Sequence, residues 1–86
     1  MNTVFLLMAE FGTADIPLDK VAPKYLSKSA ERANADAARH RLPFPVYRAG
    51  SQKSPYLVRV TDLADHLDKE RAKAELEWKK INGKAA

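Results

Sequence analysis

The hydrophobic positions near the start of the chain follow the spacing of an amphipathic helix. Apolar residues recur three and four positions apart, which predicts a short helix over residues 2–11. The residues of this apolar stripe are Val4, Leu7, Met8 and Phe11. Gly12 is suited to end the helix, because glycine adopts the left-handed backbone of a C-terminal cap without steric cost.

The next pattern combines an extended dipeptide with an interrupted helix. Ile16 precedes Pro17, and the residue before a proline is driven out of the α-helical region, so residues 16–17 are expected to be extended. Helical spacing resumes at Leu18, Val21, Ala22, Tyr25 and Leu26. Pro23 interrupts this spacing, which predicts a helix that is short or kinked there, or a new turn that starts at the proline.

An alanine-rich stretch, SAERANADAARHRL, predicts a further helix over about residues 29–41. Ser29 is a good N-terminal cap, and Glu31 lies in the first turn, where the helix dipole favours a negative charge. A thin apolar face that allows close packing is formed by Ala30, Ala33, Ala37 and Ala38. The opposite face should point to solvent, and it carries Arg32, Ala35, Asp36 and Arg39.

Two short β-patterns surround a polar loop after this helix. Pro43 and Pro45 end the helix, and residues 46–48 and 56–60 then carry β-branched and aromatic side chains in alternation. The loop between them, AGSQKSP, contains the glycine and serine residues that suit a turn. The pattern predicts a β-hairpin over residues 46–60 with Ser51, Gln52 and Lys53 at its tip.

The last pattern predicts a long helix over residues 62–81, capped by Thr61 or Asp62. Its apolar stripe, interrupted by Glu70, contains Leu63, Leu67, Ala74, Trp78 and Ile81. The first half is expected to pack on the domain and the second half to extend beyond the core. The near-heptad spacing favours a homodimer through Leu67, Ala74, Trp78 and Ile81. The alternative is that Trp78 folds back onto Phe5 or Phe11.

Together these elements predict one domain over residues 1–81, including the C-terminal helix, followed by a frayed tail at residues 82–86. The expected fold class is mainly α with a small β-hairpin. Two short helices joined by a tight connection and followed by a hairpin are typical of a winged helix-turn-helix.

The charge of the chain is concentrated in its middle. The net charge is +4, yet residues 20–59 carry nine Lys and Arg residues against two carboxylates, whereas residues 60–86 carry six charges of each sign. A localised basic block is typical of proteins that bind a polyanion, most often nucleic acid. The alternative is an unevenly charged surface that faces solvent.

Other classes of protein have little support in the sequence. The lack of cysteine excludes disulfides and thiolate metal sites and fits a cytoplasmic protein, and the apolar run at residues 4–9 is too short to cross a membrane. His40 and His66 have no partners at metal-ligand spacing and are expected at the surface. No nucleophile motif or phosphate-binding glycine loop occurs, so the sequence predicts no enzyme, metal or cofactor. The tyrosines expected in the core or at its edge are Tyr25, Tyr47 and Tyr56.

Several segments carry a family resemblance: MNTVFLLMAEFG, IPLDKVAPKYLS, LPFPV, and SQK followed by VTDLADHLDKERAKAE. Over about residues 1–75 the chain resembles the pyocin activator protein PrtN family, which consists of small bacterial and phage-encoded transcription activators. The most specific segments are MNTVFLLMA and the pair SQK and DLADHLD. At a coarser level the chain is similar to excisionase- and MerR-like winged domains. The resemblance implies a cytoplasmic regulator that binds specific double-stranded DNA and activates bacteriocin or phage genes.

In this interpretation residues 29–41 form a recognition helix in the major groove, and residues 46–60 form a wing. Arg32 is expected to pair with guanine, or alternatively to neutralise Glu31 or Asp36, and Arg39 is expected to contact a phosphate. The candidate DNA-binding residues are Lys24, Lys28, Ser29, Arg32, Asp36, Arg39, Arg48, Ser51, Gln52, Lys53 and Arg59.

Two other functions stay open from the sequence alone. The first is an excisionase-type architectural factor that bends DNA for a recombinase. The second is a small phage-derived adaptor that binds and inhibits a host protein through the helix at residues 4–11 and Trp78. For an activator, RNA polymerase is a further candidate partner besides DNA.

Overall fold

Capping residues flank the first helix at both ends. A computed structural model describes residues 2–83 of the chain, and in it α1 spans Thr3–Phe11. The side chain of Asn2 accepts a hydrogen bond from the amide of Val4 at 2.8 Å. Gly12 follows the helix with a φ of 72°, so the predicted helix and its glycine cap are both confirmed.

Pro23 divides the second helical segment, as the sequence predicts. α2 spans Leu18–Val21, and the chain continues as a π-helical turn, η1, over Ala22–Leu26. Proline has no amide hydrogen and cannot donate the regular helical bond at this point. The amide of Ser27 instead donates to the carbonyl of Ala22, five residues back, which gives the wider turn.

The alanine-rich helix, α3, spans Ala30–Ala38. The Oγ atom of Ser29 accepts a hydrogen bond from the amide of Arg32 at 3.1 Å, which confirms the predicted N-terminal cap. Ala33 and Ala37 are buried, whereas Ala38 is exposed and does not belong to the packing face. These small side chains allow α3 to pack closely against α2.

A left-handed residue, His40, ends α3 three residues earlier than the sequence predicts. His40 has a φ of 56°, and its amide donates to the carbonyl of Ala37 at 3.1 Å. The amide of Arg41 donates to the carbonyl of Asp36 at 2.9 Å. These two bonds form a Schellman motif, in which glycine is the usual left-handed residue.

Three short strands form one antiparallel sheet in the order β1–β3–β2. The strands are β1 (Asp15–Pro17), β2 (Tyr47–Arg48) and β3 (Tyr56–Arg59). β2 and β3 form the predicted hairpin, with Arg48 opposite Tyr56. β1 pairs with the other edge of β3, where Ile16 lies opposite Val58, and no sequence pattern indicated this pairing. The chain is therefore mainly helical with a small three-stranded antiparallel sheet.

One hydrophobic core joins the helices to the sheet. Its largest fully buried side chains are Ile16, Leu18, Val21, Val58 and Leu63. Burying an aliphatic side chain of this size contributes about 1.5–3 kcal/mol. Phe44 is also buried, and its ring meets the ring of His66 edge-on, with centroids 5.5 Å apart. His66 is thus half-buried instead of lying at the surface, because the LPFPV segment is anchored against it.

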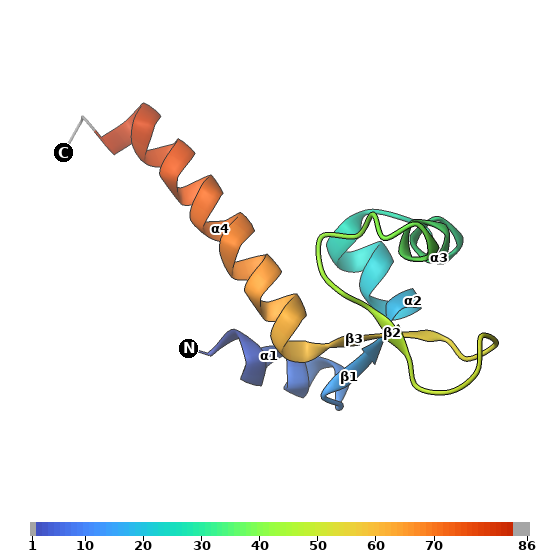
Figure 1. Ribbon diagram of the computed structural model, residues 1–86. Helices are drawn as coiled ribbons and strands as arrows, with labels where there is room; N and C mark the ends of the chain where they lie inside the picture. Colours follow the sequence, from blue (N-terminus) through green and yellow to red (C-terminus); the bar gives the residue numbers. More distant parts are fainter. Residues whose placement is uncertain (1, 84–86) are drawn as a thin grey trace.

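The last helix, α4, spans Val60–Asn82 and projects from the domain (Figure 1). The prediction that Thr61 or Asp62 caps it is wrong, because the helix starts directly at the end of β3, with Arg59 in the cap position. The amide of Val60 donates to the carbonyl of Ala14 at 2.8 Å, so pairing with the segment before β1 replaces a side-chain cap.

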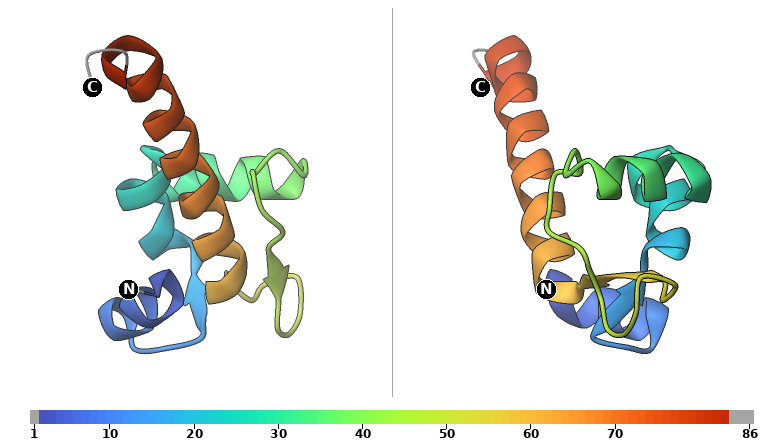
Figure 2. Two further views of the ribbon diagram at one scale, coloured as in Figure 1. Left: turned by 90° about the vertical axis from the view of Figure 1, so that its left-hand side faces the viewer. Right: turned by 45° about the vertical axis from the view of Figure 1, so that its right-hand side comes forward.

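The second half of α4 extends beyond the core, as predicted, and residues 69–83 are all exposed. α1 and the sheet lie beside its first turns (Figure 2). The helix continues to Asn82, whose side-chain amide donates to the carbonyl of Trp78 at 3.1 Å. The frayed tail predicted for residues 82–86 stays a prediction, and residues 84–86 of it lie outside the described residues. Within residues 2–83, no helix has the length and apolar character required to cross a membrane.

Candidate nucleic-acid interface

α3 and the β2–β3 hairpin lie on one side of the molecule, away from the free end of α4 (Figures 1 and 2). α2 packs against α3 and also contacts β1 and β3, so it fixes the helix relative to the sheet. The main candidate residues of the sequence, on α3 and on the hairpin tip, thus reach the same side of the protein.

The exposed surface of α3 carries the residues predicted to contact DNA. Arg32 and Arg39 are exposed, and neither makes an ion pair with any residue from 2 to 83. Arg32 lies in the first turn and Arg39 directly follows the last turn. Ser29 is exposed as well, but its hydroxyl oxygen already accepts the amide hydrogen of Arg32. Both arginines are therefore available to an external anion.

Lys28 and Asp36 bind each other. The Nζ atom of Lys28 lies 2.6 Å from Oδ2 of Asp36, and the Asp36 side chain is only 13% exposed. The hydrogen bond from Lys28 lowers the pKa of Asp36, and the positive charges of Arg32 and Arg41 lower it further. The prediction that Asp36 faces solvent is therefore wrong. The charge of Lys28 is largely neutralised by Asp36.

Lys24 is engaged with the N-terminal helix. Its ammonium group forms an ion pair with Glu10 of α1, and the hydroxyl of Tyr25 donates to the other carboxylate oxygen of Glu10 at 2.6 Å. The hydrogen bond from Lys24 is the main cause that lowers the pKa of Glu10. Burial, together with the hydrogen bond to Glu10, raises the pKa of Tyr25. Lys24 therefore stabilises the contact between α1 and η1.

The two arginines on the hairpin strands have partners within the sheet. The guanidinium of Arg48 lies over the ring of Tyr56, 4.2 Å from its centroid, which is cation–π geometry. Arg59 lies opposite Asp15 on the neighbouring strand, with 3.7 Å between Nε and Oδ1. Both arginines remain exposed at the surface, but their positions are restrained.

Asp15 also binds a tyrosine from the far strand of the sheet. The hydroxyl of Tyr47 donates to Oδ1 of Asp15 at 2.5 Å, and this bond raises the pKa of Tyr47. Tyr47 is 39% exposed, so the prediction that it lies in the core or at its edge is wrong. Its ring lies on the outer face of the sheet, where it reaches across β3 to β1.

The hairpin tip is a polar turn with outward-facing side chains. The amide of Ser54 donates to the carbonyl of Ser51 at 2.9 Å, and the amide of Lys53 donates to Oγ of Ser51 at 3.2 Å. Gln52 and Lys53 are exposed, and neither side chain bonds to another residue within 2–83. The turn thus presents one lysine and one amide side chain to the surroundings.

Within the basic block of residues 20–59, two further exposed cations were not among the predicted DNA contacts. Lys20 lies on α2 and Arg41 lies in the turn after α3, and neither forms an ion pair with a residue of the described range. The sequence contained a signal for Arg41, since it stands two residues after Arg39 in the basic block.

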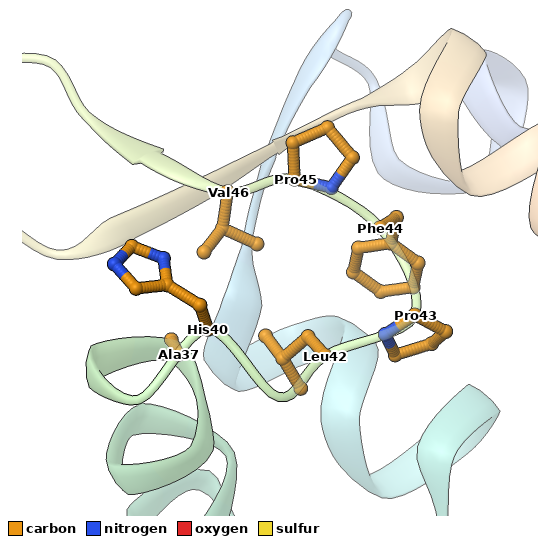
Figure 3. A pocket seen from close by; sticks show the side chains of 7 residues that line it. All are labelled: Ala37, His40, Leu42, Pro43, Phe44, Pro45 and Val46. Carbon is orange, nitrogen blue, oxygen red and sulfur yellow. The ribbon is translucent and has the colours of Figure 1, made fainter.

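A small cavity of about 290 Å³ lies between the end of α3 and the segment that leads to β2 (Figure 3). It is lined by Ala37, His40, Leu42, Pro43, Phe44, Pro45 and Val46. A second hollow of about 150 Å³ shares Phe44 and the two prolines and is otherwise lined by Asp62, Asp65, His66 and Lys69.

The free half of α4 exposes large apolar side chains. Trp78 is 61% exposed and Ile81 is 81% exposed. The alternative that Trp78 folds back onto Phe5 or Phe11 is therefore wrong, and Phe5 itself is exposed. Ala74 is exposed and Leu67 is partly buried against the core, so the stripe predicted for dimerisation starts at the core and continues into solvent.

Comparison with known protein families gives a match that covers most of the chain. Residues 3–74 match the family described as pyocin activator protein PrtN. No curated protein and no solved structure matches the chain. The matched region runs from the first residue of α1 through the middle of α4 and thus includes α3, the hairpin and the whole core. Since the match covers most of the sequence, this chain belongs to the pyocin activator protein PrtN family.

Proposed function

We propose that this protein is a sequence-specific DNA-binding regulator that activates transcription of pyocin or related phage genes in the cytoplasm. Membership of the pyocin activator family supports the regulatory role. The observation that carries the DNA-binding part is the position of α3 and the hairpin tip on one side, with exposed Arg32, Arg39 and Lys53 that have no ion-pair partner within residues 2–83.

In this proposal the fold acts as a winged helix-turn-helix. α2 with η1 is the first helix, residues 27–29 are the turn, and α3 is the recognition helix. The N-terminal part of a recognition helix reaches base edges, so Arg32 is the candidate for a guanine and Ser29 for a neighbouring phosphate. The hairpin β2–β3 is the wing.

The remaining candidate DNA-binding residues fall into three groups, according to the contacts that their side chains make within the protein. Arg39, Ser51, Gln52 and Lys53 are proposed as direct contacts to the phosphate backbone, because Lys, Arg, Ser and Gln are typical phosphate ligands. Arg48 and Arg59 lie on the strands of the wing and contribute positive charge from restrained positions. Lys24, Lys28 and Asp36 are proposed to act on DNA binding mainly by holding η1 and α3 in place.

We further propose that the protein associates with itself through the exposed stripe of α4. A Trp and an Ile that are mostly exposed on a projecting helix leave apolar area in water that association would bury. Self-association would place two or more α3 helices on one DNA molecule and add their phosphate contacts. A contact with RNA polymerase would complete the role as an activator.

The test is a titration of the full chain, by fluorescence anisotropy, against the duplex upstream of its neighbouring operon and against a shuffled duplex, each over a salt series. We expect the native duplex to bind about 100-fold more tightly or better, with a steep salt dependence. If neither that duplex nor other genomic fragments bind above the nonspecific level, the DNA-binding proposal fails. A protein-binding adaptor that uses exposed Phe5 and Trp78 would then be the better interpretation.

A further inference from the structure

Arg48 and Arg59, the two arginines of the hairpin strands, lie on opposite faces of the sheet. Side chains alternate between the two faces along a strand, so Tyr56 shares a face with Val58, which is fully buried in the core. Arg48 lies directly opposite Tyr56 on the neighbouring strand and therefore shares this face as well. Arg59 follows Val58 in the same strand and is directed to the other face.

The face that carries Arg48 is the one on which α2 and α3 lie. Val58 belongs to the same core as Val21 of α2 and Ala33 of α3. α2 contacts β3 directly and also packs against α3. Figure 1 shows both helices on one side of the sheet, with the hairpin loop below α3 in this view. Arg48 is thus directed to the side of α3, the proposed recognition helix, whereas Arg59 is directed away from it.

The two arginines also differ in how much of their charge is compensated. Oδ1 of Asp15 lies 3.7 Å from Nε of Arg59 and accepts the hydroxyl hydrogen of Tyr47 at 2.5 Å. An anion that approached Arg59 would therefore also meet the carboxylate of Asp15. Arg48 forms no ion pair with any residue from 2 to 83. Of the two strand arginines, Arg48 is the one that offers its full charge to an external anion.

The ring of Tyr56 holds the Arg48 side chain in place. The guanidinium lies over this ring, 4.2 Å from its centroid, and Tyr56 is itself half-buried against the core. Stacking on an aromatic ring uses the flat face of a guanidinium, while its N–H donors lie in the plane and remain available to an acceptor. A side chain that is already held loses less conformational entropy when it binds. The stack therefore prepares Arg48 for a contact with an anion.

The anion that fits this position is a phosphate of the DNA backbone. In the proposed function α3 lies in the major groove and the hairpin lies beside it, so the backbone at the edge of the groove passes between the two elements. Arg48 is directed to this side of the hairpin. The in-plane donors of a guanidinium match two oxygens of one phosphate, which gives a bidentate contact.

We propose that Arg48 binds a backbone phosphate of the duplex and that Tyr56 is the positioning residue that holds its guanidinium for this contact. Arg59 contacts no phosphate and instead neutralises Asp15. This inference rests on the proposed function, and it adds which arginine of the wing touches DNA and what keeps that arginine in place.

The first test compares Arg48→Ala with Arg59→Ala in the full chain, with circular dichroism to verify that each variant is folded. Binding to the duplex upstream of the neighbouring operon and to a shuffled duplex is measured by fluorescence anisotropy over a salt series. Arg48→Ala should make the slope of log K against log salt concentration shallower by about 0.9 and weaken binding to both duplexes by a similar factor. Arg59→Ala is the matched control, because it removes the same charge from an exposed strand position on the other face. It should leave the slope nearly unchanged.

The second test asks whether Tyr56 acts through Arg48. Tyr56→Leu removes the ring and should weaken DNA binding several-fold, whereas Tyr56→Phe keeps the ring and should bind like the native chain. Combined with Arg48→Ala, Tyr56→Leu should cause no further loss, because the side chain that it positions is already absent. A ring that only stabilised the fold would weaken binding by the same factor in both backgrounds.

The inference is wrong if Arg48→Ala and Arg59→Ala change the salt slope equally. It is also wrong if Tyr56→Leu weakens binding by the same factor with and without Arg48, or if Tyr56→Phe binds as weakly as Tyr56→Leu. In each of these cases the native chain still binds its duplex, so the proposed function stands. If the native chain binds no duplex above the nonspecific level, the proposed function fails, and this inference fails with it.

Discussion

Lys28 and Asp36 form an ion pair, with 2.6 Å between Nζ and Oδ2, that joins the connection before α3 to the last turns of the helix. The backbone carbonyl of Asp36 also accepts the amide of Arg41 in the turn that ends α3. One residue thus holds both the beginning and the end of this helix. Arg32 and Arg39 remain exposed on either side of the pair.

Substitution Asp36→Asn should lower stability at neutral pH and have no effect in strong acid. The hydrogen bond from Lys28 holds the pKa of Asp36 below its ordinary value of 3.8. A carboxyl group with a lowered pKa in the folded state stabilises the fold above the unfolded pKa, and this contribution disappears as the pH falls through the folded-state pKa. Thermal unfolding followed by circular dichroism at pH 7 and at several values below pH 4 measures the difference.

The control for this experiment is Asp65→Asn, since Asp65 is exposed and makes no ion pair with a residue of the described range. Its effect on the melting temperature should be small at every pH. A melting-temperature difference between the native chain and Asp36→Asn that stays constant down to pH 2 would contradict the assignment.

Substitution Lys53→Ala should reduce the salt dependence of DNA binding by one phosphate contact. Each neutralised phosphate contributes about 0.9 to the slope of log K against log salt concentration, so the slope should become shallower by about this amount. Lys69→Ala removes the same charge from α4, where the side chain is also exposed, and should leave the slope nearly unchanged. Equal effects of the two variants would mean that the hairpin makes no specific phosphate contact.

Substitution His40→Gly should stabilise the protein. A residue with a side chain costs about 1–2 kcal/mol in the left-handed conformation that His40 adopts, and glycine avoids most of this cost. We expect a gain of about 1 kcal/mol in the free energy of unfolding, measured by urea denaturation. Ala38→Gly, two residues earlier but inside the helix, should instead destabilise by about 1 kcal/mol. A loss of stability in His40→Gly would show that its side chain makes a contact worth more than the strain.

Removal of residues 71–86 should leave the domain folded. Every described residue beyond Asp68 is exposed, so truncation there removes no buried side chain, and the free energy of unfolding should change by less than about 1 kcal/mol. Removal from Leu63 onward takes away two fully packed residues, Leu63 and Ala64, and should unfold the protein. Urea denaturation of the two truncated chains tests both expectations. A large decrease in the free energy of unfolding on removal of residues 71–86 would mean that the free half of α4 contacts the core.

Features that depend on a few adjacent residues were predictable from the sequence. Gly12 and Ser29 occupy the caps that their chemistry favours, and Pro23 interrupts the second helical segment where its amide hydrogen is missing. The alternation in residues 46–48 and 56–60 was sufficient to predict the hairpin. The prediction that the second half of α4 extends beyond the core is also confirmed.

Features that depend on distant residues were not predictable in this way. β1 joins the sheet only because Ile16 reaches Val58, more than forty residues later in the chain. α4 starts at Val60, without a side-chain cap, since the amide of Val60 bonds to Ala14. Neither contact leaves a local signature in the sequence, because each depends on how the core brings two separate segments together.

The same division applies to the candidate interface. The sequence determined how many basic side chains the middle of the chain carries and which of them a helix and a hairpin would present. Only the tertiary structure decided which of those charges remain available. Lys24 meets Glu10 and Arg59 meets Asp15. Both carboxylates belong to residues 1–19, which contain three acidic residues and no Lys or Arg. An ion pair forms between groups that folding places within a few ångströms, so the availability of a charge is a property of the fold and not of the local sequence.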